Sequence, residues 1–199
     1  MRPRRVVVAS QNLDKIREVE AIVAIVAPEV EIMRGLKWPD VAETESSLQG
    51  NAILKAKAVA GYTGLAALAD DTGLEVEALG GAPGVMTARF AGLGATYKQN
   101  VDLLLQRLDG ADSRKAVFRT VIALVDPRGS QTVSQGVLHG RITCSPRGMG
   151  GFGYDSVFEV DGKTLAEMPP SEKNKISHRA LALHSLVSKV WGGGTASQR

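Results

Sequence analysis

The start of the chain limits the possible folds more than any other segment. Val6–Ala9 is a short, wholly apolar run, which is typical of a buried strand. After three polar residues, apolar side chains recur at spacings of three and four through Leu13–Ala27, and Pro28 follows. This periodicity predicts an amphipathic helix that ends before the proline. A buried strand that leads at once into such a helix indicates a sheet covered by helices.

The pattern of predicted elements changes near the middle of the chain. The first half continues to alternate, with strands predicted at 30–33 and 65–69 and helices at 48–60 and 95–108. The second half opens with two long strands, 116–125 and 131–138, whose short connection carries a hairpin signal. A strand at 156–160 and a single helix at 171–191 follow. We therefore predict an α/β or mixed α+β fold with a mixed sheet.

Composition narrows the class of protein. The chain has 199 residues, of which 44% are hydrophobic, so we expect one domain over residues 1–193 and a flexible tail at 194–199. Cys144 is the only cysteine, which excludes a disulfide within the chain and fits a cytoplasmic protein. The longest apolar stretch, Ala21–Ala27, is too short to span a membrane. The net charge of +3 suits a polyanionic ligand without naming one.

Two adjacent carboxylates, Asp70 and Asp71, follow the strand predicted at 65–69. Ends of strands are where α/β proteins place catalytic groups, and two carboxylates in one turn repel each other unless a cation lies nearby. Mg²⁺ takes oxygen ligands of this kind and bridges to phosphates. Glu43 or Glu45, in the loop before the next helix, would complete such a site. The alternative is a plain turn in which an aspartate caps a helix.

The loop between the first strand and the first helix is a candidate phosphate site. Ser10–Lys15 supplies a hydroxyl, side-chain amides and a lysine at a helix N-terminus, where backbone N–H groups and the helix dipole favour an anion. The loop lacks the GxxxxGK[ST] pattern of a P-loop. The alternative is that Ser10 or Asn12 only caps the helix and that Lys15 lies in solvent.

A glycine-rich segment, Gly148–Gly153, is a candidate for contact with a base. It formally matches GxGxxG, but a strand rather than a helix follows it, which argues against a dinucleotide-binding loop. We interpret it as a loop that lets Phe152 stack on a base. The alternative places Phe152 and Tyr154 in the core.

A last polar cluster lies in the helix predicted at 171–191. Lys173 and Ser177 are four residues apart and would share a face of that helix, and His178 and Arg179 follow directly. An arginine only donates hydrogen bonds, so it favours a six-oxo purine over adenine. The alternative is a solvated helix face.

In their order and spacing these motifs resemble the inosine triphosphate pyrophosphatase family, also called the noncanonical purine NTP pyrophosphatases. The resemblance spans residues 9–183 and is carried by five segments, ASQNLDKIREVE, ETESSLQGNAILKAKA, LADDTGLEVEALGGAPGVMTARFAG, GGFGYDSVFEV and KTLAEMPPSEKNKISHRALAL. It implies an elongated mixed β-sheet with flanking helices, two lobes around a central cleft and a homodimer.

The resemblance also implies roles for single residues. Asp71 would be catalytic and a ligand of Mg²⁺, with Mn²⁺ as a substitute, while Asp70 would assist it and Glu43 would be the second metal ligand. The implied substrate-binding residues are Ser10, Gln11, Asn12, Lys15, Thr72, Phe152, Gly153, Tyr154, Asp155, Lys173, His178 and Arg179. Three positions depart from the family pattern, because Gln11 and Glu45 stand in place of glycines and Gly50 in place of a glutamate.

The implied function is hydrolysis of ITP, dITP and XTP to the monophosphate and pyrophosphate, which keeps deaminated purines out of DNA and RNA. We expect a small-molecule nucleotide as the partner, and neither nucleic acid nor a membrane. Two other functions stay open at this point. One is a Maf-like pyrophosphatase acting on pyrimidine or methylated nucleotides. The other is a nucleotide- or RNA-binding protein without turnover, against which the acidic pair argues, since an anion binder gains nothing from carboxylates.

Overall fold

The computed structural model describes residues 2–192, so the tail predicted at 194–199 lies outside the described residues. Within this part the strands are β1 (Arg5–Val8), β2 (Glu31–Met33), β3 (Ala66–Val76), β4 (Pro83–Gly84), β5 (Lys115–Val125), β6 (Gln131–Ile142), β7 (Phe158–Val160) and β8 (Lys163–Thr164). The helices are α1 (Leu13–Val26), α2 (Leu48–Thr63), α3 (Tyr97–Arg107), α4 (Pro170–Ile176) and α5 (His178–Val190), with two short 3-10 helices, η1 (Glu77–Leu79) and η2 (Thr87–Arg89).

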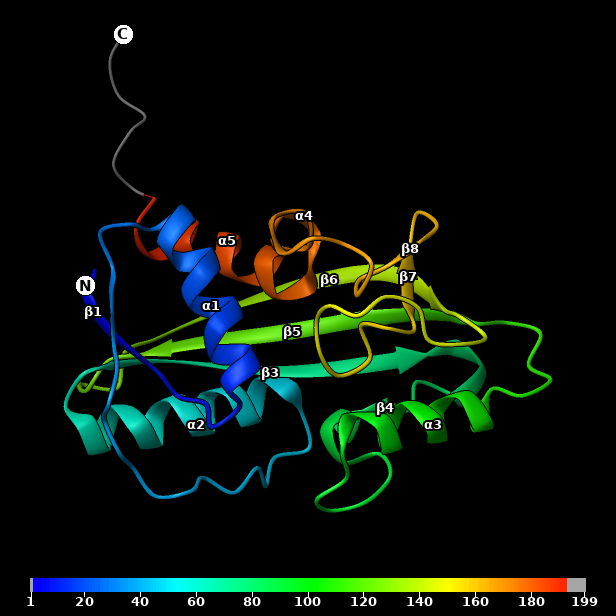
Figure 1. Ribbon diagram of the computed structural model, residues 1–199. Coiled ribbons are helices and arrows are strands. Elements are labelled where there is room, and N and C mark those ends of the chain that lie inside the picture. Colours follow the sequence, from blue (N-terminus) through cyan, green and yellow to red (C-terminus); the bar gives the residue numbers. More distant parts are fainter. Residues whose placement is uncertain (1, 193–199) are drawn as a thin grey trace, which may run out of the picture. The chain divides into compact units, whose positions relative to one another are not determined.

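The eight strands of the described residues form one mixed sheet. Its order is β2-β1-β3-β5-β6-β7-β8, and β4 pairs with β3 outside this path. β1 pairs in parallel with both β2 and β3, as expected of strands connected through helices. The long strands β3, β5 and β6 run side by side in Figure 1, and residues 126–130 join the last two as the predicted hairpin. The mixed α/β fold class predicted from the sequence is confirmed.

The chain divides into two compact units. Within the described residues, unit 1 comprises 2–71, 120–136 and 179–192. Its core joins apolar side chains of β1, α1, the first part of β3 and α5, for example Val6, Val19, Leu68 and Leu183, all at most 2% exposed. This packing fixes the N-terminal end of α1 and the strand that carries Asp70 and Asp71.

Unit 2 comprises residues 72–119 and 137–178. Its separate core includes Leu74 from β3, Leu104 from α3, Phe118 from β5 and Phe158 from β7. The rings of Phe118 and Phe158 lie 4.5 Å apart between centroids. Unit 2 therefore has apolar packing of its own around the glycine-rich segment and α4.

One strand is longer than the sequence predicts. The prediction placed a turn at Asp70 and Asp71, but β3 continues through both carboxylates and Gly73 to Val76. The prediction was wrong because it treated two charges and a glycine as strand breakers. Lysine and arginine side chains from other elements neutralise the carboxylates, and Leu74 and Glu75 pair with Gly84 and Pro83 of β4.

The helix predicted at 171–191 is two helices. Ser177, between α4 and α5, has φ −62° and ψ 151°, which is extended backbone, so Lys173 and Ser177 do not share a helix face as predicted. The prediction of a solvated helix face is also wrong, because Lys173, Ser177, His178 and Arg179 are all at most 5% exposed. The break separates Lys173, which pairs within unit 2, from Arg179, which pairs within unit 1.

No helix between residues 2 and 192 combines the length and the apolar character needed to cross a membrane.

Candidate active site

Asp70 and Asp71 are the buried centre of the candidate site, at 2% and 6% exposure. They are consecutive residues of β3, and successive side chains of a strand point to opposite faces of the sheet. The side-chain hydrogen bonds and ion pairs of the two carboxylates therefore differ, although the charges of Lys15 and Lys55 act on both, and these partners belong to unit 1.

Asp70 lies among cations. Its Oδ2 accepts hydrogen bonds from Nη2 and Nε of Arg179, at 3.0 and 3.3 Å, and lies 3.3 Å from Nζ of Lys15. The Arg179 guanidinium also donates from Nη1 to Glu18. Burial raises the pKa of Asp70, but Lys15, Arg179 and Lys55 together outweigh it and hold this pKa well below its ordinary value. Asp70 is thus ionised at neutral pH within a buried network.

Asp71 lies in a different environment. Its Oδ2 accepts from the side-chain amide of Asn51 at 3.2 Å, and its Oδ1 lies 3.6 Å from Nζ of Lys55. Burial, with a contribution from Glu43, raises the pKa of Asp71, because Lys55 and Lys15 only partly offset these effects. A buried carboxylate with a raised pKa is suited to accept a proton from water.

Lys55 connects Asp71 to the loop before α2. Its Nζ donates to Oε1 of Glu43 at 2.5 Å and to the backbone carbonyl of Asp70 at 2.8 Å. Burial lowers the pKa of Lys55, but Asp71, Asp70 and Glu43 together raise it above its ordinary value. The ammonium group is therefore charged and holds Glu43 close to Asp71.

The family resemblance implies a metal ion held by Glu43 and Asp71. Among residues 2–192 no group of three or more carboxylate, imidazole or thiolate side chains is arranged to hold a metal ion. Glu43 and Asp71 nevertheless share the Lys55 ammonium, and their mutual repulsion contributes to the raised pKa of Asp71. Mg²⁺ at phosphate sites commonly uses one or two carboxylates together with waters and phosphates. The pair fits an ion of that kind.

The N-terminal loop adopts a conformation that caps α1. Asn12 is the N-cap, and its side chain accepts from the backbone N–H groups of Asp14 and Lys15 at 3.0 and 3.3 Å. The Ser10 hydroxyl accepts from the backbone of Asn12. The capping alternative therefore holds for Asn12, whereas Lys15 is not in solvent but paired with Asp70. Gln11 is exposed, and Thr72 follows Asp71 in β3 at the start of unit 2.

Two of the departures from the family pattern are sterically linked. A Cβ atom placed on Gly50 would lie 2.7 Å from Cβ and 2.9 Å from Cγ of Glu45. Real Cβ contacts are not that short, so the glutamate at 45 requires the glycine at 50 unless one of them shifts. The backbone N–H of Glu45 meanwhile donates to Oδ1 of Asn51, which connects this loop to the partner of Asp71.

The second group of predicted residues lies in unit 2 around Asp155. The Oδ2 atom of this buried carboxylate accepts from the backbone N–H of Phe152 at 2.8 Å and from Nζ of Lys173 at 2.5 Å. Lys173 Nζ also lies 5.0 Å from the centroid of the Phe152 ring. Gly151 has φ +68°, and a Cβ atom there would lie 2.1 Å from Oδ2 of Asp155. The glycine is therefore required for the carboxylate to lie under this loop.

The rings of Tyr154 and His178, two other residues predicted to contact the base, pack against side chains of unit 2. The Tyr154 hydroxyl donates to the carbonyl of Thr87, and its ring belongs to the core of unit 2, which agrees with the core alternative for this residue. Burial raises the pKa of Tyr154. The His178 ring stacks on Phe118, with centroids 4.4 Å apart. Phe152 is only half-buried, and Gly153 follows it with φ +64°.

Sequence reasoning missed several residues of these clusters. Glu18, Asn51 and Lys55 are partners of the predicted site residues in unit 1. Helical spacing is the signal that could have found them, because Glu18 is three residues from Lys15 on α1, and Asn51 and Lys55 are four apart on α2. In unit 2 the ring of Tyr97 lies 5.9 Å from that of Phe152, which no sequence pattern indicates.

Comparisons with known proteins cover nearly the whole chain. Residues 6–189 match the profile of the Ham1 family. A protein named dITP/XTP pyrophosphatase from Methylococcus capsulatus is 42% identical over 193 residues, which cover 94% of this chain and 96% of the relative. A protein of the same name from Thermoanaerobacter sp. is 45% identical over 192 residues, with the same coverage.

Solved structures agree with these relatives. A HAM1 protein from Coxiella burnetii superposes with a TM-score of 0.82 at 39% identity, covering 95% of this chain and 99% of that one. A nucleoside-triphosphatase / dITP/XTP pyrophosphatase from Mycobacterium abscessus has a TM-score of 0.71 at 38% identity, covering 92% of this chain and 97% of that one. The resemblance stated from the sequence motifs is confirmed.

Proposed function

Because the chain belongs to the Ham1 family, we propose that it hydrolyses noncanonical purine nucleoside triphosphates, ITP, dITP and XTP, to the monophosphate and pyrophosphate. The observation that carries this proposal is the identity of 42% and 45%, over 94% of the chain, with two relatives named dITP/XTP pyrophosphatase. Its role in the cell would be to keep deaminated purines out of the nucleotide pool.

In the proposed reaction Asp71 accepts a proton from a water molecule. The water oxygen bonds to the α-phosphorus, the bond from this phosphorus to the bridging oxygen breaks, and pyrophosphate leaves with that electron pair. The raised pKa of Asp71 supports the assignment of the base. The ion pair between Asp70 and Lys15 positions the lysine side chain. Lys15 and the N-terminal loop, including Ser10, Gln11 and Asn12, bind the phosphates.

Glu43 and Asp71 are the proposed ligands of a divalent cation, Mg²⁺ or its substitute Mn²⁺. When bound, the ion would neutralise charge on the triphosphate. Lys55 holds Glu43 within reach of Asp71 through its hydrogen bond of 2.5 Å, so the two carboxylates are positioned before the ion arrives.

Recognition of the base is proposed for the residues around Asp155. Phe152 offers a half-buried ring for stacking, while Lys173, whose Nζ lies over that ring, and Asp155 offer a donor and an acceptor. The roles of Thr72, Gly153, Tyr154 and His178 in substrate binding stay predictions, and the ring of Tyr154 lies in the core of unit 2. The contact of Arg179 with the six-oxo group stays a prediction, because its guanidinium donates to Asp70 and Glu18 in the structure.

The test is pyrophosphate release with Mg²⁺ across ITP, dITP, XTP, GTP, ATP, CTP and UTP. The proposal expects kcat/KM for ITP and XTP to exceed that for ATP by about a hundredfold, roughly 3 kcal/mol. Turnover of pyrimidine nucleotides instead would favour the Maf-like function, and binding without turnover would favour a nucleotide-binding protein. A homodimer and a cytoplasmic location also stay predictions, and light scattering of the purified protein tests the first.

A further inference from the structure

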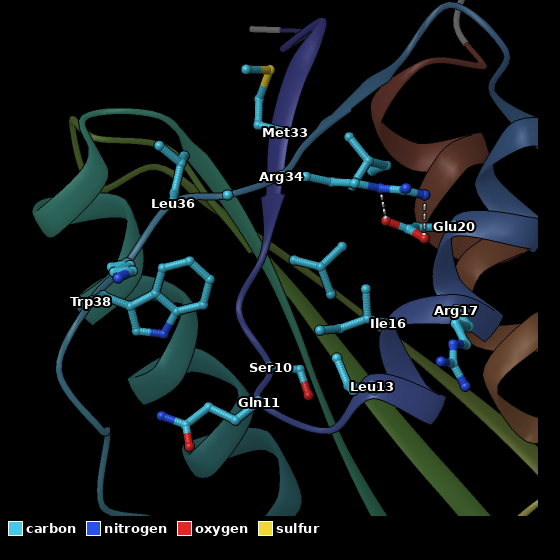
Figure 2. A pocket seen from close by; sticks show the side chains of 14 residues that line it. Ser10, Gln11, Leu13, Ile16, Arg17, Glu20, Met33, Arg34, Leu36 and Trp38 are labelled. Atoms are coloured by element: carbon cyan, nitrogen blue, oxygen red, sulfur yellow. Dashed lines mark hydrogen bonds and ion pairs between the residues drawn. The ribbon is translucent and has the colours of Figure 1, made fainter.

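Unit 1 contains a pocket of about 720 Å³ that shares Ser10 and Gln11 with the residues of the proposed reaction and extends away from the carboxylates. Its wall includes Leu13, Ile16, Arg17 and Glu20 of α1, on one side, and the segment after β2 that ends at Trp38. Figure 2 shows the indole of Trp38 and the side chains of Ile16 and Leu13 extending toward the same space. The volume lies in the range of small-molecule sites, which is roughly 300–1,000 Å³.

The pocket and the carboxylate site use opposite faces of α1. At about 100° per residue, Leu13, Ile16, Arg17 and Glu20 fall on one side of the helix. Lys15 and Glu18, which contact Asp70 and Arg179, fall on the other. The pocket meets the candidate active site only at Ser10 and Gln11, where α1 begins. A ligand in the pocket would therefore not compete for the Asp70 and Asp71 clusters.

The lining combines an apolar wall with net positive charge. Leu13 is 64% exposed and Leu36 is 39% exposed, so this wall leaves large apolar side chains in contact with water. The charged lining residues are Arg17, Arg34, Lys37 and Glu20. Arg34 donates two hydrogen bonds of 2.7 Å to Glu20, seen as dashed lines in Figure 2, so this pair is neutral. Arg17 forms an exposed ion pair with Asp14, whose Oδ1 lies 3.7 Å from Nη1, so Lys37 supplies the net positive charge of the lining.

We infer that this pocket binds a flat organic anion, with its ring against Trp38 and Ile16 and its charged group toward Lys37. An inorganic anion would leave the apolar wall in water, and a neutral apolar molecule would leave Lys37 without a counter-charge. An aromatic ring that carries one phosphate or one carboxylate satisfies both parts of the lining. This inference is independent of the proposed function.

Isothermal titration calorimetry with three probes tests the chemistry at low ionic strength. Naphthalene-2-sulfonate supplies ring and charge, naphthalene-2-sulfonamide supplies the same ring without charge, and sodium sulfate supplies charge alone. We expect one sulfonate site per chain, about tenfold weaker binding of the sulfonamide, and no measurable heat from sulfate. Equal affinity for sulfonate and sulfonamide would overturn the role of the Lys37 charge.

Matched variants locate the binding. Trp38→Ala should weaken sulfonate binding at least about tenfold, whereas Tyr62→Ala, which removes an exposed aromatic ring on α2, should not change it. Lys37→Gln should weaken binding by a few fold, and Lys57→Gln, on the exposed side of α2, is its control. Circular dichroism of each variant checks folding. Unchanged binding to Trp38→Ala would exclude this pocket.

Two further measurements separate the pocket from the active site. Binding to Asp71→Asn should match that of the unaltered protein, and Trp38→Ala should keep kcat and KM for ITP within about twofold. A loss of both sulfonate binding and turnover in Trp38→Ala would make the pocket a part of the substrate site and overturn the inference. Displacement of sulfonate by adenosine monophosphate would identify an aromatic phosphate, displacement by benzoate an aromatic carboxylate, and displacement by neither would contradict the ligand class.

Discussion

Asp70 and Asp71 are neighbours in one strand and both are buried, yet they differ in their direct partners and in the direction of their pKa shifts. Asp70 is held by Arg179 and Lys15, and cations keep its pKa well below the ordinary value. Asp71 is held by a neutral amide and a more distant ammonium group, and burial raises its pKa. The alternation of a strand is what separates them, because it directs consecutive side chains to opposite faces.

From this difference we propose a structural role for Asp70 and a chemical role for Asp71. A fully neutralised carboxylate stabilises the network around it but accepts a proton poorly. A carboxylate with a raised pKa costs stability when it ionises, and it is the better base. The predictions below test this division, beginning with the largest expected effect.

Asp71→Asn should lower kcat by about 10⁴-fold, because it removes the proposed base and one ligand of the cation. The free energy of unfolding of this variant at pH 7 should equal or exceed that of the unaltered protein. A folded-state pKa above the unfolded value contributes stability below the unfolded pKa, and this contribution is lost as the pH rises through the folded pKa. Ionised Asp71 is therefore unfavourable at neutral pH. Single-turnover kinetics and urea unfolding measure the two effects, and near-normal turnover would refute the assignment.

Asp70→Asn should lower the free energy of unfolding by about 3 kcal/mol at pH 7, since it leaves the buried Arg179 guanidinium without its main partner. The lowered pKa of Asp70 contributes stability above its ordinary value of 3.8, and this contribution is lost as the pH falls toward the folded pKa. The difference in free energy of unfolding between the variant and the unaltered protein should thus become smaller below about pH 4. Asp102→Asn, which breaks an exposed pair with Lys98, is the control and should cost under about 1 kcal/mol.

Arg179→Lys tests the role of the guanidinium group, because it keeps the positive charge and removes the planar arrangement of N–H donors. If Arg179 reads the six-oxo group as predicted, the ratio of kcat/KM for ITP to that for ATP should fall about thirtyfold, roughly 2 kcal/mol. An unchanged ratio, with lower kcat for every nucleotide, would mean that Arg179 acts only by positioning Asp70.

Phe152→Ala should raise KM for ITP about tenfold with little change in kcat, because stacking on the ring is lost while the carboxylates of unit 1 are untouched. Phe152→Tyr keeps an aromatic face and should stay close to the unaltered protein. A fall in kcat without a change in KM would contradict a role in binding the base.

Local periodicity predicted much of the fold. The apolar spacing of Leu13–Ala27 gave α1 almost to the residue, and the hairpin signal at 126–130 gave β5 and β6. It could not predict that β3 continues through Asp70, because the charge that allows this comes from Arg179, 109 positions away. Nor could it predict the break at Ser177, since helical spacing continues across it.

The sequence indicated which residues make up the candidate site better than it indicated how they contact one another. The sequence motifs indicated Asp155, Lys173 and Phe152 as neighbours in function, and these three are in direct contact. Lys55 was overlooked because a lysine in an Ala- and Lys-rich helix resembles a solvated side chain. Only the packing of α2 shows that this lysine is 12% exposed and lies between two carboxylates.

The contact between positions 45 and 50 also limits the order in which this loop can change. With Glu45 in place, any side chain at position 50 meets it at 2.7 Å, so a glutamate cannot return to 50 without displacing the loop next to Asn51. With glycine at 45 this contact is removed, and Ser47 Oγ, 3.1 Å from the added Cβ atom, is the close neighbour that remains. A change to the common family pattern is therefore less obstructed when residue 45 changes first than when residue 50 changes first, so the effect of a substitution at 50 depends on residue 45, beside the proposed catalytic carboxylate.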